Sequence, residues 1–202
     1  MFKTGTYTGD GAAAQPIVGV GFRPVAVFIF PQVDSVRGDA TRSSADPANT
    51  FEWSFGLDYF YSVAGIASLD ADGFTVNGIN FNVNLRVYTY YCFGAACGWQ
   101  TATGIYTGDG NATQAIVGVG FQPKLIFIIH RVPNGTNTPS VKTDQDGLNA
   151  YSWDSVVNQW RYTTDEIISL DAGGFTVGDG TPLARNDLNV LAQDYGYVAF
   201  RE

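Results

Sequence analysis

The sequence is poor in the residues that most metal sites and polyanion-binding surfaces need. Among 202 residues there are two cysteines and one histidine. This set cannot complete a zinc site with four nitrogen and sulfur ligands. Basic residues are also scarce, because 11 Lys and Arg stand against 19 Asp and Glu and give a net charge of −8. That balance argues against sequence-independent nucleic-acid binding and against docking on an anionic membrane.

Long apolar runs are missing too. The apolar run nearest to the N-terminus, at 25–30, is far shorter than the roughly 20 residues that cross a bilayer. No secretory signal precedes the first motif at Gly5. We therefore expect synthesis in a reducing cytoplasm, with free thiols at Cys92 and Cys97 favoured over a disulfide. Cys92 aligns with Ala199 and is expected in a small apolar slot at a strand end.

What the chain does contain is a long internal repeat. Residues Gly5–Phe30 and Gly104–Ile129 are identical at 17 of 26 aligned positions, at a constant offset of 99. A second block at 66–76 returns at 167–177, and a third at 88–93 returns at 195–200. Each copy is long enough to bury its own core. The repeat therefore predicts two tandem domains, 1–94 and 104–202, joined by a short connector at 95–103 that contains Trp99.

Both copies have the sequence pattern of short strands. Aromatic residues make up 14% of the chain and glycine numbers 24, which suits strands joined by tight turns. The apolar runs at 25–30 and 125–129 predict strands buried on both faces. Phe22 and Phe121, each between a glycine and a Pro-containing turn, are expected in the core. About seven strands per copy, with no sustained helical period, predict an all-β fold of two homologous β-sandwiches.

The copies diverge at 31–65 and 130–166, which we expect to be variable polar loops and the first places to look for specificity. Aromatic residues persist there: Trp53 matches Trp153, Tyr61 lies near Tyr162, and Phe60 is paired with Trp160. These rings could form a sugar-stacking platform, but packing in the core explains them at least as well. The candidate surface-recognition residues are Trp53, Tyr61, Trp153, Trp160 and Tyr162.

No catalytic or metal motif is complete. His130 follows a strand without any accompanying catalytic motif, and we favour a polar strand end over a catalytic base. The segments 70–73 and 144–147 resemble fragments of calcium loops but lack the full spacing, so we favour solvated turns. A hydrolase would need a carboxylate pair; the candidates by sequence proximity are Glu52, Asp58 and Asp154. We expect no enzyme, no cofactor and no metal.

The repeated pattern resembles a repeat found in tail-fibre and other virion proteins of tailed bacteriophages, over almost the whole chain. In the first copy the matching residues are Gly5, Tyr7, Gly9, Gly11, Gly21, Phe22, Pro24, Gly73, Phe74, Asn84, Tyr88 and Tyr90. In the second they are Gly104, Tyr106, Gly108, Gly110, Gly120, Phe121, Pro123, Gly174, Phe175, Asn189, Tyr195, Tyr197, Ala199 and Phe200. The first copy departs from the pattern at Cys92, where the family has alanine.

The resemblance implies a scaffold rather than a site, because these residues mostly build turns and core. We expect a non-enzymatic structural component of a tailed-phage virion, made in the host cytoplasm: an exterior decoration, fibre or tail-associated subunit, with a role in host-surface attachment. The alternative is a carbohydrate-binding adhesion module that takes a host-surface glycan. Expected partners are capsid or tail proteins and further copies of the chain, with a trimer favoured.

Overall fold

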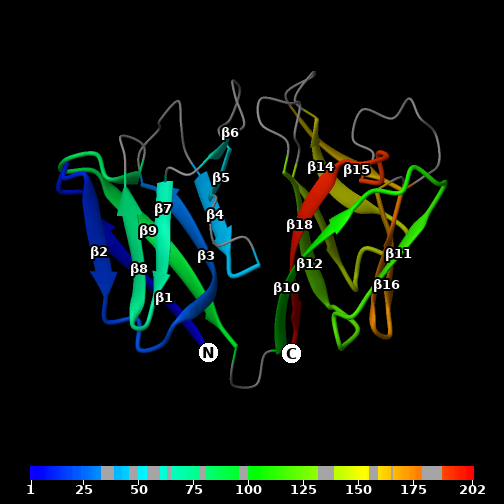
Figure 1. Cartoon of the computed structure of the whole chain (residues 1–202), viewed down its shortest axis with the longest axis horizontal. Helices are drawn as coiled ribbons and strands as arrows, with labels where there is room; N and C mark the ends of the chain where they lie inside the picture. The colour runs from blue at the N-terminus through cyan, green and yellow to red at the C-terminus, as the bar shows by residue number, and fades with distance from the viewer. Residues whose placement is uncertain are drawn as a thin grey trace. The chain divides into compact units, whose positions relative to one another are not determined.

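The computed structural model is all-β in the part of the chain that it describes (Figure 1). The described residues are 1–32, 39–45, 50–53, 60–62, 65–77, 81–95, 100–131, 139–154, 159–164, 166–178 and 188–202, with backbone alone at 39–40, 51–53, 60–62, 153–154 and 159–160. No helix among them has the length and apolar character needed to span a bilayer. The chain divides into two compact units, Met1–Gly98 and Trp99–Glu202.

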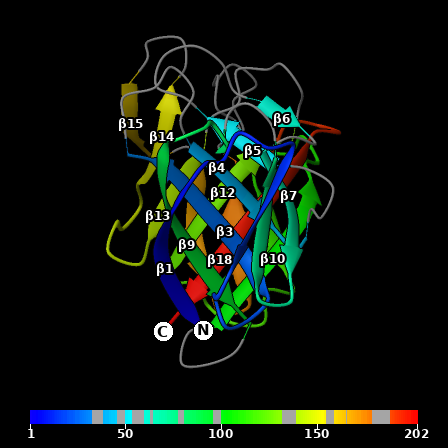
Figure 2. The same cartoon turned by 90° about the vertical axis from the view of Figure 1, so that its left-hand side faces the viewer.

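The first unit contains two antiparallel sheets. The six-stranded sheet has the strand order β1 (Phe2–Thr8), β9 (Val87–Gly94), β3 (Pro24–Pro31), β4 (Asp39–Ser43), β5 (Thr50–Trp53) and β6 (Phe60–Ser62). Several of these strands lie side by side in Figure 2. The three-stranded sheet has the order β2 (Ala14–Val18), β8 (Gly73–Asn77) and β7 (Gly65–Asp70).

The second unit has the same two sheets in the same strand order, as the sequence repeat predicts. Its six-stranded sheet consists of β10 (Gln100–Thr107), β18 (Asp194–Arg201), β12 (Leu125–His130), β13 (Ser140–Thr143), β14 (Ala150–Asp154) and β15 (Gln159–Thr163). Its three-stranded sheet consists of β11 (Gln114–Val117), β17 (Gly174–Val177) and β16 (Ile167–Asp171).

Each unit has one hydrophobic core between its two sheets, which is the arrangement of a β-sandwich. In the first unit Val27 and Ile29 of the large sheet pack with Phe74 and Val76 of the small one. The second unit has its own cluster, which includes Ile126 and Phe175. The predicted all-β, sandwich-like fold is therefore confirmed.

Several core predictions are also confirmed. Along β3, residues 26 to 29 are all buried although successive side chains point to opposite faces of the sheet. Phe22 and Phe121 both belong to the cores of their units. Cys92 is a free, fully buried cysteine in the first core, and burial raises the pKa of its thiol to about 12. Cys97 and Trp99 lie outside the described residues.

Two predictions about the positions of loops and strands are wrong. The expected loops at 31–65 and 130–166 contain three strands each, β4 to β6 and β13 to β15. Strands β4, β5, β13 and β14 contain buried polar residues (Thr41, Thr50, Ser140 and Ser152), so their sequences lack the apolar alternation that indicates a strand. The expected connector is also too long, because β10 begins at Gln100 and pairs with Arg201 at the end of β18.

Candidate functional site

Tyr162 is the one predicted recognition residue whose side chain the structure describes, and it lies at the surface. It sits on β15 with 49% of its area exposed, directly opposite Tyr151 on β14, which is 44% exposed. The two ring centroids are 4.6 Å apart and the rings are tilted by 37°. Tyr162 is therefore not a core residue, and the neighbouring Tyr151, which the sequence reasoning passed over, completes an exposed pair.

The other four predicted residues can be placed by backbone only. Trp53 lies on β5, Tyr61 on β6, Trp153 on β14 and Trp160 on β15, and their side chains lie outside the described part of the structure. The register pairs Trp153 with Trp160, two residues along the hairpin from the Tyr151–Tyr162 pair. Their assignment to a recognition surface stays a prediction.

The register also corrects one of the aromatic matches. Tyr61 pairs with residue 51 in the first unit and Tyr162 pairs with residue 151 in the second, so these two tyrosines occupy equivalent positions. By the same register Phe60 is equivalent to Arg161 rather than to Trp160. The error arose because the sequence match at this hairpin was made without knowing the strand pairing.

The turn that precedes β14 anchors Tyr162. The hydroxyl of Tyr162 donates to the backbone oxygen of Asp146 at 3.2 Å, and the amide of Asn149 donates to the same oxygen at 3.0 Å. The carboxylate of Asp146 accepts from both the amide and the hydroxyl of Thr143, each at 2.7 Å. The buried Lys142 ammonium donates to the backbone oxygen of Asn149. The segment 144–147 is thus a turn fixed by its own hydrogen bonds, as predicted.

The calcium-like segment of the first unit is also a structural turn. Both oxygens of the Asp72 carboxylate accept backbone amides, from Gly19 at 3.1 Å and from Gly21 at 2.5 Å. Asp70 accepts the hydroxyls of Ser68 and Thr75. Among the described residues, no three His, Cys, Asp or Glu are grouped in a way that could hold a metal ion.

His130 lies at the end of β12, as expected, but it is buried rather than solvated. It is 6% exposed, and its ring packs edge-on against Tyr195 with centroids 4.7 Å apart. Burial lowers the pKa of the imidazole to about 4, so it is neutral at pH 7. Its Nε2 atom has no hydrogen-bond partner among the described residues. A neutral, enclosed ring of this kind fits a packing role.

The second unit places further polar groups in its interior. The hydroxyl of Ser140 donates to the carboxylate of Glu166, and both residues are buried. Burial also lowers the pKa of Lys142, and the nearby Asp146 carboxylate opposes that shift. The first unit places Arg42 at the position of Lys142, where its guanidinium donates to the backbone oxygen of Ile66.

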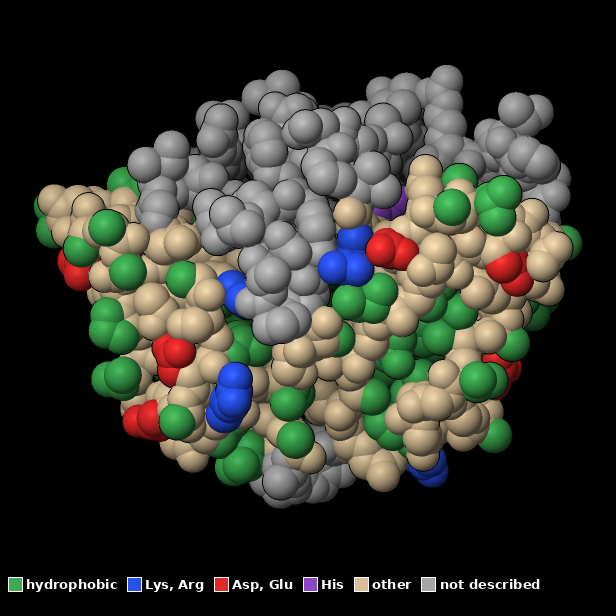
Figure 3. Space-filling view, in the orientation of Figure 1, with side chains coloured by type: hydrophobic (Ala, Val, Ile, Leu, Met, Phe, Trp, Pro, Cys, Tyr) green, Lys and Arg blue, Asp and Glu red, His purple; other side chains and the backbone are tan. Residues whose placement is uncertain are grey.

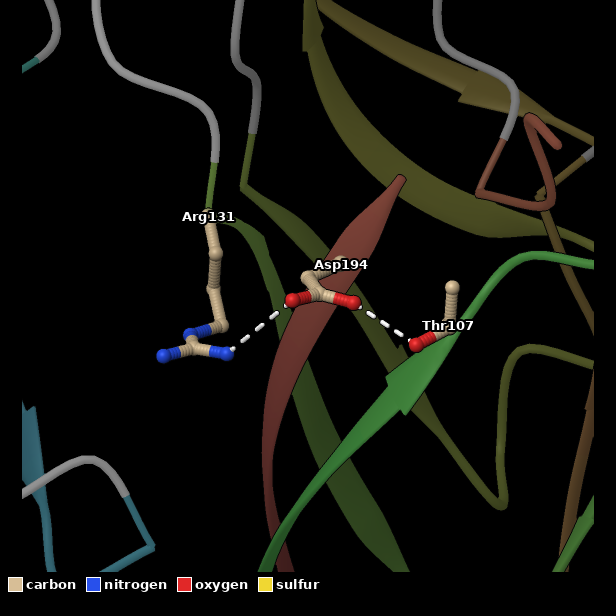
Figure 4. Close-up of polar contacts among 3 residues, drawn as sticks. All are labelled: Thr107, Arg131 and Asp194. Carbon is tan, nitrogen blue, oxygen red and sulfur yellow. Dashed lines mark hydrogen bonds and ion pairs between the residues drawn. The ribbon is translucent and has the colours of Figure 1, made fainter. Parts of the chain in front are cut away.

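A surface ion pair closes one end of the large sheet in the second unit (Figure 4). Asp194, at the start of β18, accepts the hydroxyl of Thr107 at 2.7 Å and lies 3.5 Å from the guanidinium of Arg131. The amide of Arg131 also donates to the backbone oxygen of Asp194 at 2.9 Å. These contacts tie the ends of β10 and β12 to β18. Both carboxylate oxygens of Asp194 take part in these contacts, so the role of the cluster is to join the strands.

A hydrogen-bonded node occurs in both units at the Gly-Asp-Gly turn. In the first unit Asn82 donates to the Asp10 carboxylate at 2.7 Å and to the backbone oxygen of Ala12 at 2.9 Å, and its own oxygen accepts the amide of Asp10 at 3.0 Å. Asn189 makes the same three bonds to Asp109 and Asn111. Amide and asparagine donors lower the pKa of both Asp10 and Asp109.

This node corrects the assignment of the repeated asparagine. The sequence match placed Asn84 opposite Asn189, but Asn82 occupies the equivalent position, six residues before the stacked Tyr88. Asn84 is exposed. Gly9 shows why the neighbouring glycine is needed, because a Cβ there would lie 2.2 Å from the backbone oxygen of Val83.

The three carboxylates proposed for a hydrolase stay a prediction, because the structure describes none of their side chains. Glu52 lies on β5 and Asp154 on β14, with side chains outside the described ones, and Asp58 lies outside the described residues. On the face shown in Figure 3, the described acidic side chains are dispersed among hydrophobic and uncharged ones.

Comparison with known proteins gives a family but no characterised relative. No curated protein and no solved structure matches the chain. A family model described as a domain of unknown function, DUF7483, matches residues 97–201, which is 105 of the 202 residues and nearly the whole of the second unit. The first unit has the same strand order and the same asparagine node. The chain therefore belongs to the DUF7483 family.

Proposed function

We propose that this protein is a non-enzymatic structural component of a tailed-phage virion, located on its exterior as a decoration, fibre or tail-associated subunit. The observation that carries the proposal is the role of the residues that resemble virion repeats. In both units they form the glycine turns and the stacked tyrosines, Tyr7 with Tyr88 and Tyr106 with Tyr195. The matching Asn189 also forms the asparagine node of the second unit, whereas Asn82 forms it in the first. They are scaffold residues, and their use twice in one chain suits a subunit whose task is to present surfaces.

The elements that differ between the units support the same proposal. The hairpins β5–β6 and β14–β15 lie at one edge of the large sheets, and exposed positions on them such as Tyr151 and Tyr162 can vary without disturbing the core. A scaffold with variable edge hairpins is the arrangement expected of a subunit that contacts different neighbours or a host surface through its two units.

Mass spectrometry of purified phage particles tests this proposal. The chain should be present at a stoichiometric copy number that survives washing and density-gradient purification. A matched lysate fraction without particles serves as the control. Absence of the chain from intact particles, with the protein abundant in the lysate, would overturn the proposal.

We further propose that the subunit is a homo-oligomer, with a trimer favoured. A trimer of a two-unit chain presents six related units to a larger assembly. Multi-angle light scattering and native mass spectrometry should give three times the 21.8 kDa chain mass. A monomer that also fails to bind purified capsids or tails would contradict this assembly.

A second candidate function, a carbohydrate-binding adhesion module, is favoured by one observation. The exposed pair of Tyr151 and Tyr162 is a surface feature that core packing does not require. Exposed aromatic side chains stack on apolar ligand faces at a low cost in conformational entropy. This function is compatible with a virion location, because a subunit on the exterior can expose the pair to a host-surface glycan.

A further inference from the structure

The tyrosine platform, which we define as Tyr151 and Tyr162, lies on the outer face of the edge hairpin. The residues before and after Tyr151, Ala150 and Ser152, are fully buried on the opposite face. The alternation of the strand therefore directs Tyr151 away from the core, and its cross-strand partner Tyr162 lies beside it. Since both rings remain 44% and 49% exposed while in contact with each other, they offer one continuous apolar surface.

The platform is held in place by hydrogen bonds. The Tyr162 hydroxyl is bound to the backbone of the 144–149 turn at Asp146. That turn is closed by the Thr143 and Asn149 amides and by the Lys142 ammonium. A ring fixed in this way loses little conformational entropy when a ligand stacks on it, and preorganisation of this kind increases affinity.

The turn at 144–149, which contacts Tyr162 through Asp146, also carries polar side chains. Asp144 and Gln145 are exposed, and Asn149 is partly exposed. Carboxylate and amide groups of this kind can exchange hydrogen bonds with sugar hydroxyls, while the rings cover the apolar C–H face of a pyranose. Leu148, 75% exposed, adds apolar area within the turn.

Charge decides between the classes of ligand. The turn contributes the carboxylates of Asp144 and Asp146, and the cation Lys142 is buried and engaged with Asn149. Two exposed cations are also near: Arg161 precedes Tyr162 on β15, and the backbone oxygen of Lys124 accepts the amide of Asp144. The whole chain carries a net charge of −8. The exposed cations beside the platform do not outnumber the carboxylates, so there is no excess of positive charge to hold an anionic ligand such as a sialylated or uronic glycan, a nucleic acid or a phospholipid headgroup, and the net charge of the chain opposes its approach.

From this geometry we infer that the tyrosine platform is a binding site for uncharged oligosaccharides. The inference rests on the proposed host-attachment role, for which it names the ligand class and the residues. Tyr151 and Tyr162 stack on the sugar, and the 144–149 turn orients it.

The test is a glycan array probed with the full-length purified protein, followed by isothermal titration with the best uncharged oligosaccharide on the array. Neutral hexose and N-acetylhexosamine glycans should bind in preference to their sialylated or uronic counterparts. Tyr151→Ala and Tyr162→Ala should each weaken binding about tenfold, the loss expected when roughly 50–60 Å² of apolar contact disappears. Tyr162→Phe keeps the ring but removes the hydroxyl that anchors it, so it should weaken binding less than Tyr162→Ala.

Val117→Ala is the matched control, because Val117 is an exposed apolar residue on β11 of the same unit, 80% exposed and outside the platform. Each variant is first shown to be folded by near-ultraviolet circular dichroism and to have the wild-type mass by light scattering. A changed oligomeric mass in the tyrosine variants would identify the platform as a subunit contact and overturn the inference. A blank array, or binding that neither Tyr→Ala variant reduces, would overturn it as well. Because purified protein is used, failure here is distinguishable from absence of the chain from virions.

Discussion

At three equivalent positions the second unit has a buried polar residue and the first unit has Pro, Ala or Gly. His130 pairs with Tyr195 in the second unit where Pro31 pairs with Tyr88 in the first. Ser140 and Glu166 likewise stand where the first unit has Ala40 and Gly65, as the strand registers show. Buried polar groups lower stability when their partners or charge states are lost. The second unit should therefore respond to acid in a way that the first does not.

The pH response of His130 gives the first prediction. Burial lowers its pKa in the folded state to about 4, below the roughly 6.5 of an unfolded chain. The unfolded state therefore binds more protons between these values, so the stabilising effect is complete above pH 6.5 and is lost as the pH falls toward 4. We expect His130 to reduce the free energy of unfolding by about 2–3 kcal/mol at pH 4.5 relative to pH 7.

His130→Phe removes the titrating group and keeps an aromatic ring against Tyr195. Denaturant unfolding of wild type and variant, each at pH 7 and pH 4.5, separates this histidine from the carboxylates that also titrate. The wild type should lose more stability on acidification than the variant. Equal losses in the two proteins would mean that the imidazole is already accessible to protons in the folded state.

At the scale of elements, both units share the Gly-Asp-Gly turn with its asparagine node. Asn82 joins the turn after β1 to the segment before β9, and Tyr7 adds a hydrogen bond from its hydroxyl to the backbone oxygen of Phe81 at 2.7 Å. The matching bond from Tyr106 reaches Leu188 at 3.0 Å. One end of each sandwich is thus closed by side-chain bonds between segments far apart in sequence.

Asn82→Ala should destabilise the first unit by about 2–3 kcal/mol, because one substitution removes three hydrogen bonds of a side chain that is only 2% exposed. Asn84→Ala is the matched control, since Asn84 is exposed, and its effect should stay within about 0.5 kcal/mol. Guanidinium unfolding curves measure both. Equal effects of the two substitutions would contradict the assignment of Asn82 to the node.

The strands that the sequence predicts correctly are those whose inward residues are apolar. The run at 25–30 and the terminal strands show clear hydrophobic patterns, so their positions and burial could be foreseen. Strands β4 and β13 could not, because their inward positions include Arg42, Ser140 and Lys142, which are buried and hydrogen-bonded. A polar strand of this kind has the composition of a loop.

The candidate site could be predicted only in part, because the sequence alone does not show which way a strand residue faces. Tyr162 was recognised as a repeated aromatic residue, but repetition alone could not decide between core and surface. The decision depends on register: a shift of one residue would turn Tyr151 and Tyr162 toward the core. Asn82 was missed because two asparagines lie two residues apart, and only their hydrogen bonds distinguish them.

At the scale of the whole molecule, each unit is stabilised by a core made of its own residues. The two hydrophobic clusters share no member, and Phe22 and Phe121 occupy the same place in each. The ring of Phe22 packs so closely on Gly94 that a Cβ there would lie 2.6 Å from it. Separate cores allow the stability of one unit to be altered without direct change to the core of the other.

Phe22→Ala and Phe121→Ala form the last prediction. Each removes a ring that is less than 10% exposed, and each should lower the free energy of unfolding of its own unit by about 3–5 kcal/mol. Hydrogen-exchange mass spectrometry resolves the units because peptides from 1–98 and 99–202 are distinct. Phe22→Ala should accelerate exchange chiefly in β3 and β9, and Phe121→Ala chiefly in β12 and β18. If either substitution accelerated exchange equally in both units, the two cores would have to unfold as one cooperative body.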